Sequence, residues 1–270
     1  MRQPQRDSVR GPVGDVSYLE WPGSPNEVPV VFLHPVNTAA AVWAEVAQEM
    51  AGARRAVAVD YRGHGRSASG TSYLPADFAA DALAVVDALE LDRVHLVGGS
   101  IGGAVAIEIA ARAPSRVASV AVFGATLHIG LSPAELEPLL SGLAELGVEE
   151  WFARHGGEIL GPRSRRGATA RLVELAGGRD PDLVIEIVRS TFQIADSRAT
   201  AAALPGPRPP ALVAVGTHDP TCPHSMAREL AGYLGAQVLT MTGVGHLPML
   251  EVPGEVATLL DDLHTQAASP

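Results

Sequence analysis

Short segments rich in valine and leucine recur along this chain, and they constrain its fold more than any other feature. Nearly continuous apolar runs of about four to eight residues are typical of strands buried on both faces of a sheet. Six such segments lie at residues 28–34, 55–61, 93–99, 117–124, 211–217 and 236–242. Helical patterns separate the first four, at residues 39–51, 75–90 and 101–113. This alternation predicts an α/β fold with a mostly parallel sheet that helices cover on both faces.

The alternation of strands and helices is interrupted once. It stops after the fourth apolar segment and resumes with the fifth, and the stretch between them reads mainly as helices. The N-terminal segment 14–23 adds one or two edge strands, which brings the expected sheet to about eight strands. We therefore expect a core domain formed by residues 1–127 and 206–270, and a helical lid at 128–205 that is inserted after the sixth strand.

The charge balance of the chain limits its partners. Its 20 basic and 30 acidic residues give a formal net charge of −10, whereas binding to nucleic-acid phosphates needs a basic surface. The first ten residues hold no apolar run typical of an export signal, and no window of about 18 apolar residues could span a membrane. We expect a cytoplasmic protein with a small-molecule substrate and without nucleic-acid or membrane partners; a homodimer is compatible with this sequence.

The segment at residues 94–110 raises the first question about chemistry. In it a short apolar run leads into GGSIGG and then into an alanine-rich helical pattern, so Ser100 stands between a strand and a helix. A dinucleotide-binding loop has the same surroundings, but G-x-G-x-x-G starting at Gly98 would need glycine where Ser100 stands. The pattern G-x-S-x-G is instead typical of a strained turn that exposes a nucleophilic serine.

A nucleophilic serine needs an acid and a histidine to activate it. Asp219 follows the strand expected at 211–217, and His246 follows the strand expected at 236–242. Because the carboxyl ends of parallel strands meet at one edge of a sheet, we expect both side chains to lie near Ser100. The three residues also occur in the order serine, aspartate, histidine that accompanies this kind of turn. The sequence thus predicts a catalytic triad.

Together these motifs resemble those of the α/β-hydrolases, and the resemblance covers nearly the whole chain. It rests on FLHPVNTAAAVW (32–43), DYRGHGRS (60–67), GGSIGG (98–103), GTHDPTCP (216–223) and GVGHLPMLEVP (243–253). The resemblance implies that Ser100 attacks a carbonyl carbon, that His246 transfers the proton, and that Asp219 orients the imidazole. It is strongest toward the branch that contains carboxylesterases and enol-lactonases.

The resemblance also implies an oxyanion hole made of two backbone N–H groups. One belongs to Ile101, the residue after the nucleophile. The other comes from the loop that follows the apolar segment 28–34. In this loop Pro35 replaces the usual glycine and has no N–H to donate. We therefore expect Val36 to supply the second donor. The predicted substrate-binding residues are His34, Trp151, Phe152 and Phe192.

The expected reaction is hydrolysis of a carboxylic ester or lactone with a small to medium, largely apolar substrate. Two alternatives use the same triad: cleavage of a carbon–carbon bond, and a specialised biosynthetic hydrolase or cyclase reaction. A ligand-binding protein on a hydrolase scaffold is a further alternative. We expect no cofactor and no metal ion, because the spacing of His218, Cys222 and His224 matches no zinc signature.

Overall fold

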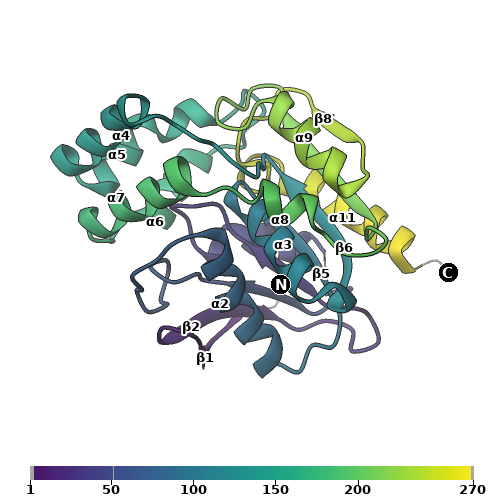
Figure 1. The fold of residues 1–270 in the computed structure, drawn as a ribbon. Helices are drawn as coiled ribbons and strands as arrows, with labels where there is room; N and C mark the ends of the chain where they lie inside the picture. The colour runs from purple at the N-terminus through teal and green to yellow at the C-terminus, as the bar shows by residue number, and fades with distance from the viewer. Residues whose placement is uncertain (1–2, 51, 269–270) are drawn as a thin grey trace.

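An eight-stranded sheet forms the centre of the computed structural model, which describes residues 3–50 and 52–268 (Figure 1). The strands lie in the order β1-β2-β4-β3-β5-β6-β7-β8. Strand β2 pairs antiparallel with β1 and β4, and the remaining neighbours pair parallel. The carboxyl ends of β3 to β8 therefore share one edge. The strands are β1 (Gln5–Arg10), β2 (Asp15–Trp21), β3 (Val30–Leu33), β4 (Ala56–Val59), β5 (Val94–Gly99), β6 (Val117–Phe123), β7 (Ala211–Gly216) and β8 (Val238–Met241).

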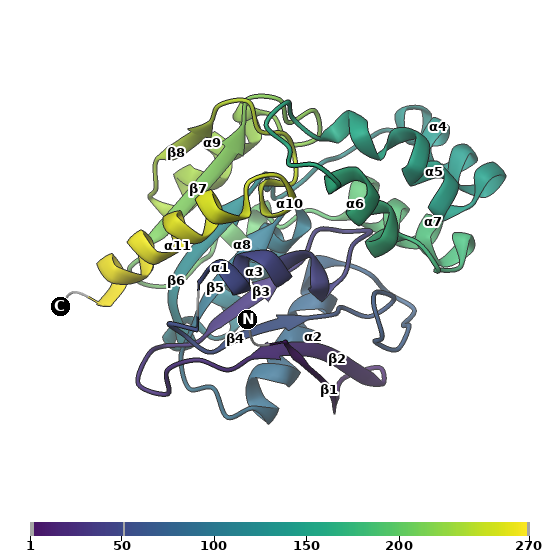
Figure 2. The same ribbon diagram turned by 180° about the vertical axis from the view of Figure 1, so that it is seen from behind.

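Helices cover both faces of this sheet, as the opposite views in Figures 1 and 2 show. On one face α2 (Pro75–Ala88) packs against α3 (Ile101–Arg112), and α9 (His224–Leu234) packs on β7. On the other face α1 (Ala44–Glu49) packs against α11 (Pro253–Ala268). The shorter helical elements of this part are η1 (Ala40–Trp43), η2 (Pro114–Arg116), α8 (Arg198–Ala202) and α10 (Pro248–Glu251).

The segment between β6 and β7 contains a group of helices that lies beyond one end of the sheet in both views. These lid helices are α4 (Pro133–Leu146), α5 (Val148–His155), η3 (Gly156–Ile159), α6 (Ala168–Ala176), α7 (Pro181–Arg189) and η4 (Ser190–Ile194). Ser132 begins α4 with a capping box, in which its backbone N–H donates to the Glu135 carboxylate at 2.9 Å. The Asp180 carboxylate begins α7 by accepting from the backbone N–H of Asp182 at 2.8 Å.

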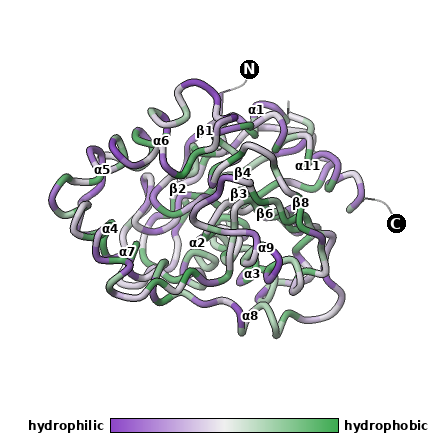
Figure 3. Tube along the Cα trace, turned by 90° about the horizontal axis from the view of Figure 1, so that it is seen from above, coloured by the Kyte–Doolittle hydropathy of each residue, from purple (hydrophilic) through white to green (hydrophobic). Residues whose placement is uncertain are grey.

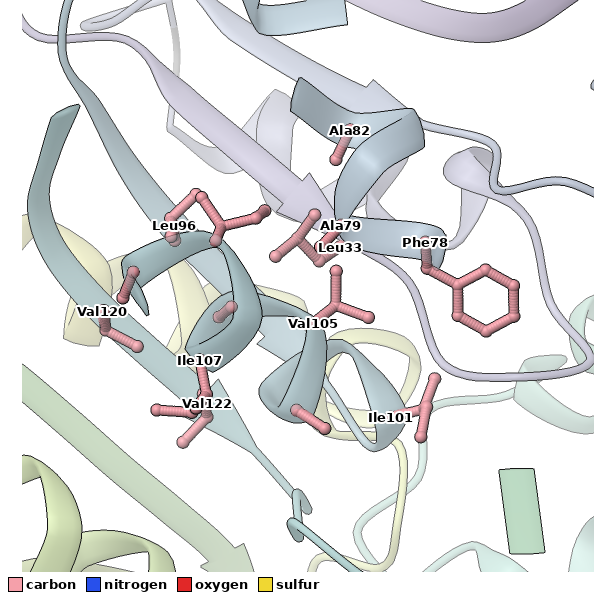
Figure 4. Close-up of a cluster of buried hydrophobic side chains, with 14 of the residues drawn as sticks. Leu33, Phe78, Ala79, Ala82, Leu96, Ile101, Val105, Ile107, Val120 and Val122 are labelled. Carbon is pink, nitrogen blue, oxygen red and sulfur yellow. The ribbon is translucent and has the colours of Figure 1, made fainter. Parts of the chain in front are cut away.

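The apolar core lies on both sides of the sheet. Figure 3 shows hydrophobic residues along the central strands. In Figure 4, Leu33 of β3, Phe78 of α2 and Val105 of α3 lie in the layer between sheet and helices, and all three are fully buried. On the opposite face Phe32 stacks on Trp43 with ring centroids 5.0 Å apart. Burial on both faces explains why these strands read as continuous apolar runs.

The predicted fold class is confirmed, with two differences in detail. Where the sequence predicted one helix at 39–51, Ala40–Trp43 form a 3₁₀ turn and Ala44–Glu49 a short α-helix, and residue 51 lies outside the described residues. The segment 14–23 supplies one strand, β2, which lies inside the sheet between β1 and β4, while the edge strand β1 comes from residues for which no strand was predicted. Strand β1 is mostly exposed and polar, so it carries no apolar signal. None of the described helices is long and apolar enough to cross a membrane.

Candidate active site

Ser100 occupies a strained turn between β5 and α3. Its backbone has φ 52° and ψ −120°, a conformation that residues other than glycine rarely adopt. Two backbone hydrogen bonds hold the turn: the N–H of Ser100 donates to the carbonyl of Phe123 at 3.0 Å, and Gly103 N–H donates to the carbonyl of Ser100 at 2.9 Å. The sharp reversal puts the serine at the carboxyl end of the central strand, as a nucleophile elbow requires.

The glycines around Ser100 are needed because other backbone segments approach them closely. A Cβ at Gly98 would lie 2.4 Å from the backbone of Gly102, and a Cβ at Gly102 would lie 2.3 Å from the carbonyl oxygen of Leu33. Neither approach leaves space for a side chain. The G-x-S-x-G pattern of the sequence is therefore a packing requirement of this turn.

His246 and Asp219 meet at the ends of the two neighbouring strands. The Nδ1 atom of His246 lies 3.0 Å from both carboxylate oxygens of Asp219. The same carboxylate accepts hydrogen bonds of 2.9 Å from the backbone N–H groups of Thr221 and Cys222, which fix its orientation. Because an ionised carboxylate can only accept, the proton of the neutral imidazole belongs on Nδ1. The Nε2 atom is then free to take a proton.

A cavity of about 100 Å³ joins these groups to the lid. Ser100, His246 and Val36 line it from the core. Of the predicted substrate contacts, Trp151, Phe152 and Phe192 line it from the lid, together with other apolar side chains. Asp219 is not among the lining residues, and lies behind His246, where a residue that orients the imidazole should lie.

The loop after β3 closes one wall of the cavity. The carbonyl oxygen of Pro35 accepts from the Thr38 hydroxyl at 2.7 Å and from Nδ1 of His34 at 2.8 Å, so it is turned back into its own loop. Val36 and Asn37 follow and line the cavity, and Asn37 has a positive φ of 61°. Ile101 begins α3 directly after Ser100, with its side chain buried.

The structure places His34 differently from the predicted substrate contact. The residue is fully buried and is not among the residues that line the cavity. Its Nδ1 is used by Pro35, and its Nε2 accepts from the backbone N–H of Tyr61 at 3.2 Å. Burial lowers the pKa of His34 to about 4, so its ring is neutral. His34 shapes the loop after β3, because both of its nitrogens are engaged by the backbone.

Contacts with the lid hold the loop that carries His246. The backbone N–H of His246 donates to the carbonyl of Ile159 in the lid at 2.7 Å. Neither Gly161 nor Gly245 has room for a Cβ, since each would meet the other's backbone N at 2.5 to 2.6 Å. The imidazole therefore depends on the lid for its position as well as on Asp219.

Glu251 also connects the lid to the loop that carries His246. It was not among the predicted site residues. This carboxylate is 1% exposed and accepts four hydrogen bonds of 2.7 to 3.0 Å. Two donors belong to the lid and two to the histidine loop; they are Gly161 N–H, Ser164 Oγ–H, Gly245 N–H and Leu247 N–H. The available signal was a glutamate in an otherwise apolar motif, but a single sequence gives no indication of what such a residue contacts.

One group of possible metal ligands occurs among the described residues. Ligand atoms of Asp219, Cys222 and His246 lie within 4.8 Å of one another. The carboxylate of Asp219 is already engaged by His246 and two backbone N–H groups. Burial and the nearby Asp219 raise the pKa of the Cys222 thiol well above its usual value, which disfavours the thiolate that binds metals. These donor atoms suit a hydrogen-bonded triad better than a cation.

Comparison with known proteins finds several hydrolases among the proteins that are similar to this chain. Curated relatives include 2-hydroxy-6-oxo-2,4-heptadienoate hydrolase of Pseudomonas putida, 41% identical over 102 residues; that match spans 36% of this chain and only 37% of the relative. Rhodomycin D methylesterase of Streptomyces peucetius is 27% identical over 290 residues, covering 93% of this chain and 95% of the relative. The crystal structure of an enol-lactonase from Burkholderia xenovorans matches with a TM-score of 0.84 at 23% identity, covering 96% of this chain and all of that one.

The printed names of these proteins point to different substrates. Residues 30–259 of this chain match the alpha/beta hydrolase family, and this range includes Ser100, Asp219 and His246. The chain therefore belongs to the alpha/beta hydrolase family.

Proposed function

We propose that this chain hydrolyses a carboxylic ester or lactone through an acyl-enzyme on Ser100. The observation that carries the proposal is the arrangement of three groups at one edge of the sheet. Ser100 stands on the strained elbow, and His246 faces the same cavity while both oxygens of Asp219 engage its Nδ1 at 3.0 Å. A serine, a base and an orienting acid in this relation are what acyl transfer needs.

In the proposed reaction the Ser100 hydroxyl attacks the carbonyl carbon and its proton passes to Nε2 of His246. The tetrahedral intermediate then expels the alcohol, or opens the lactone ring, and His246 returns the proton to that oxygen. A water molecule attacks the acyl-enzyme with the same base, which releases the acid and restores Ser100. Asp219 stabilises the imidazolium in both steps without being protonated itself.

The negative oxygen of the intermediate needs donors that are already in place. Ile101 starts helix α3, so its N–H is one of the groups that an α-helix leaves without an internal partner. Val36 lines the cavity and follows Pro35, which has no N–H. These two groups are the proposed oxyanion hole, and donors of this kind typically contribute about 3 to 4 kcal/mol each.

The proposed substrate is small to medium and largely apolar. The lid contributes Trp151, Phe152 and Phe192 to the cavity, and apolar surface dominates the lining. Such a wall favours an acyl chain by removing its surface from water. An ester or lactone as substrate class also agrees with the methylesterase and the enol-lactonase among the similar proteins.

Cleavage of a carbon–carbon bond is the second candidate, because one similar protein is a 2-hydroxy-6-oxo-2,4-heptadienoate hydrolase. The same serine could attack a ketone carbon and release a stabilised carbanion. Values of kcat/KM for matched esters, lactones and vinylogous diketones separate the two candidates. The ester proposal expects the first two classes to exceed the third.

The direct test is Ser100→Ala. We expect kcat/KM for a short-chain ester to fall by roughly a thousandfold or more, because this change removes the nucleophile. Ser225→Ala is the matched control, since Ser225 is exposed on α9, and it should keep full activity. A folded Ser100→Ala protein with wild-type esterase activity would refute the proposal. A wild-type protein that binds esters without hydrolysing them would instead indicate a ligand-binding role.

A further inference from the structure

The side chain of Arg179, in the lid between α6 and α7, is partly buried and lacks an acidic partner among the described residues. Its Nη1 is fully buried and has no hydrogen-bond partner among them. The Nε atom donates to the carbonyl of Ala176 at 3.2 Å, and Nη2 donates to Oδ1 of Asn37 at 3.1 Å. Desolvation by burial lowers the pKa of Arg179 to about 10, so it remains charged at neutral pH.

The contrast with Arg62 makes this charge unusual. Arg62 is more deeply buried than Arg179, but its guanidinium binds both oxygens of the buried Asp81 at 2.7 and 2.9 Å. No described carboxylate forms an ion pair with Arg179. Withdrawing a charge from water without a counter-charge is unfavourable. Among the described side chains, Asn37 is the one to which Arg179 donates a hydrogen bond.

The contact with Arg179 fixes the direction of the Asn37 amide. A guanidinium can only donate, and therefore Asn37 must present its oxygen to it. The amide nitrogen Nδ2 then lies on the other branch of the side chain. This nitrogen donates to no described residue. It is nevertheless not one of the fully buried polar atoms without a partner, so part of its surface is accessible. Asn37 lines the cavity that contains Ser100 and His246, which offers open space next to this side chain.

We propose that Nδ2 of Asn37, oriented by Arg179, binds a second acceptor oxygen of the substrate, such as a ketone or carboxylate oxygen near the scissile carbonyl. The inference rests on the proposed ester or lactone hydrolysis and narrows its substrate class. The charge of Arg179 polarises the amide and favours electron-rich oxygens beside it. Asn37 is thus a specificity-determining residue, while Arg179 positions it.

The first test compares esters that differ only by an added oxygen function. One set is methyl pentanoate, methyl 4-oxopentanoate and monomethyl glutarate; the other is butyl acetate and 3-oxobutyl acetate, which puts the oxygen on the alcohol side. For the wild-type protein we expect at least one oxygenated ester to exceed its plain partner in kcat/KM by about fivefold to tenfold, as one net hydrogen bond provides. The ketone and carboxylate members distinguish the two sources of the oxygen.

Asn37→Asp is the matched variant. It keeps the size of the side chain, tolerates the positive φ and can still accept from Arg179, but it has no N–H to offer the substrate. We expect the preference for the oxygenated ester to disappear, while thermal unfolding shows a protein at least as stable as wild type. If Asn37 had a structural role alone, Asn37→Asp would lower kcat/KM for the plain and the oxygenated esters by the same factor.

Arg179→Gln tests the positioning role. Glutamine can donate to Asn37 Oδ1 but carries no charge, so a carboxylate preference should fall more than a ketone preference. Arg189→Gln is the control, because Arg189 is an exposed arginine in the same lid, and it should leave the ratios unchanged.

Two outcomes overturn the inference: wild-type ratios within twofold of one in both sets, or an equal loss for plain and oxygenated esters in Asn37→Asp. The second would give Asn37 a structural role that does not distinguish between substrates. If no ester is turned over, protection of Ser100 from a fluorophosphonate by 4-oxopentanoate, compared with pentanoate, measures the same ratio. Failure of Ser100 to react with the fluorophosphonate would instead mark failure of the proposed function.

Discussion

The sheet edge and the lid form opposite walls of one cavity, and they are held in different ways. At the sheet edge the backbone itself fixes the reacting groups: Ser100 stands on a strained turn, and its flanking glycines contact neighbouring backbone directly. The lid has a backbone contact to the His246 loop, but polar side chains also attach it, among them Glu251 and the Arg179 contact to Asn37. The sheet edge therefore has little freedom to vary, whereas the lid can change its lining residues and keep its attachment. We infer that the edge determines the reaction and the lid determines the substrate.

The largest expected effect comes from adding one methyl group at the sheet edge. Gly102→Ala would put a Cβ 2.3 Å from the Leu33 carbonyl oxygen, which forces α3 and β3 apart. We expect a loss of about 4 kcal/mol in the free energy of unfolding, together with loss of activity. Urea unfolding measures it. Gly232→Ala in α9, where a Cβ meets no atom within 4 Å, is the control and should stabilise by about 0.8 kcal/mol. Equal effects of the two changes would contradict the backbone packing.

The next effect should come from the attachment of the lid. Glu251→Gln replaces a carboxylate that accepts four hydrogen bonds by an amide with one acceptor oxygen, so buried N–H groups lose their partner. We expect about 3 kcal/mol lower stability and a fall in kcat, since the His246 loop loosens. Ser164→Ala removes a single donor and should cost about 1 kcal/mol. An unchanged kcat in Glu251→Gln would mean that the His246 loop keeps its position without this attachment to the lid.

A smaller effect is the pH dependence of stability that a buried histidine of α11 should cause. His264 is fully buried and stacks on His95 with centroids 4.0 Å apart, and neither of its nitrogens has a hydrogen-bond partner in the part of the chain that the structure describes. Burial lowers the pKa of His264 to about 4, so the folded protein cannot take up the proton that the unfolded chain binds below about pH 6.5. Stability is then unaffected above pH 7 and falls as the pH drops toward 4. By pH 5 this histidine should account for about 2 kcal/mol of the loss.

Urea unfolding of His264→Leu at pH 7.5 and pH 5 tests this assignment. The loss of stability between the two pH values should shrink by about 2 kcal/mol relative to wild type. His218→Gln, at an exposed histidine, should leave the loss unchanged. The same pH dependence in wild type and His264→Leu would place the titrating groups elsewhere.

The smallest effect should come from the lid wall. Phe192→Ala removes a half-buried ring that lines the cavity, so we expect about 1 to 2 kcal/mol less binding of an acyl chain, seen as a higher KM with little change in kcat. Ile194→Ala is the matched control, because that neighbouring side chain is 59% exposed. A fall in kcat without a change in KM would mean that this lid residue takes part in the chemistry.

The sheet and the elbow could be predicted because their signals are local. Strands buried on both faces need continuous apolar runs, and the turn at Ser100 needs glycines beside it, so both leave a pattern within a few residues. Asp219 and His246 could be predicted because each follows a recognisable strand, and parallel strands bring their carboxyl ends together.

Other parts of the site depend on contacts between distant segments. The Glu251 carboxylate reaches back about 90 residues to Gly161 and Ser164, and Arg179 reaches 142 residues back to Asn37. A single sequence carries no sign of such pairings. For the same reason His34, next to a cavity residue in sequence, looked like a substrate contact, although the backbone uses both of its nitrogens.

The most direct test of the central claim is covalent labelling of the protein by a fluorophosphonate, followed by mass spectrometry of its peptides. The account predicts one adduct per chain, on Ser100, and a labelling rate at least about a hundredfold lower in His246→Ala, because the serine is a weak nucleophile without its base. An unlabelled but folded wild-type protein, or equal rates for wild type and His246→Ala, would contradict it.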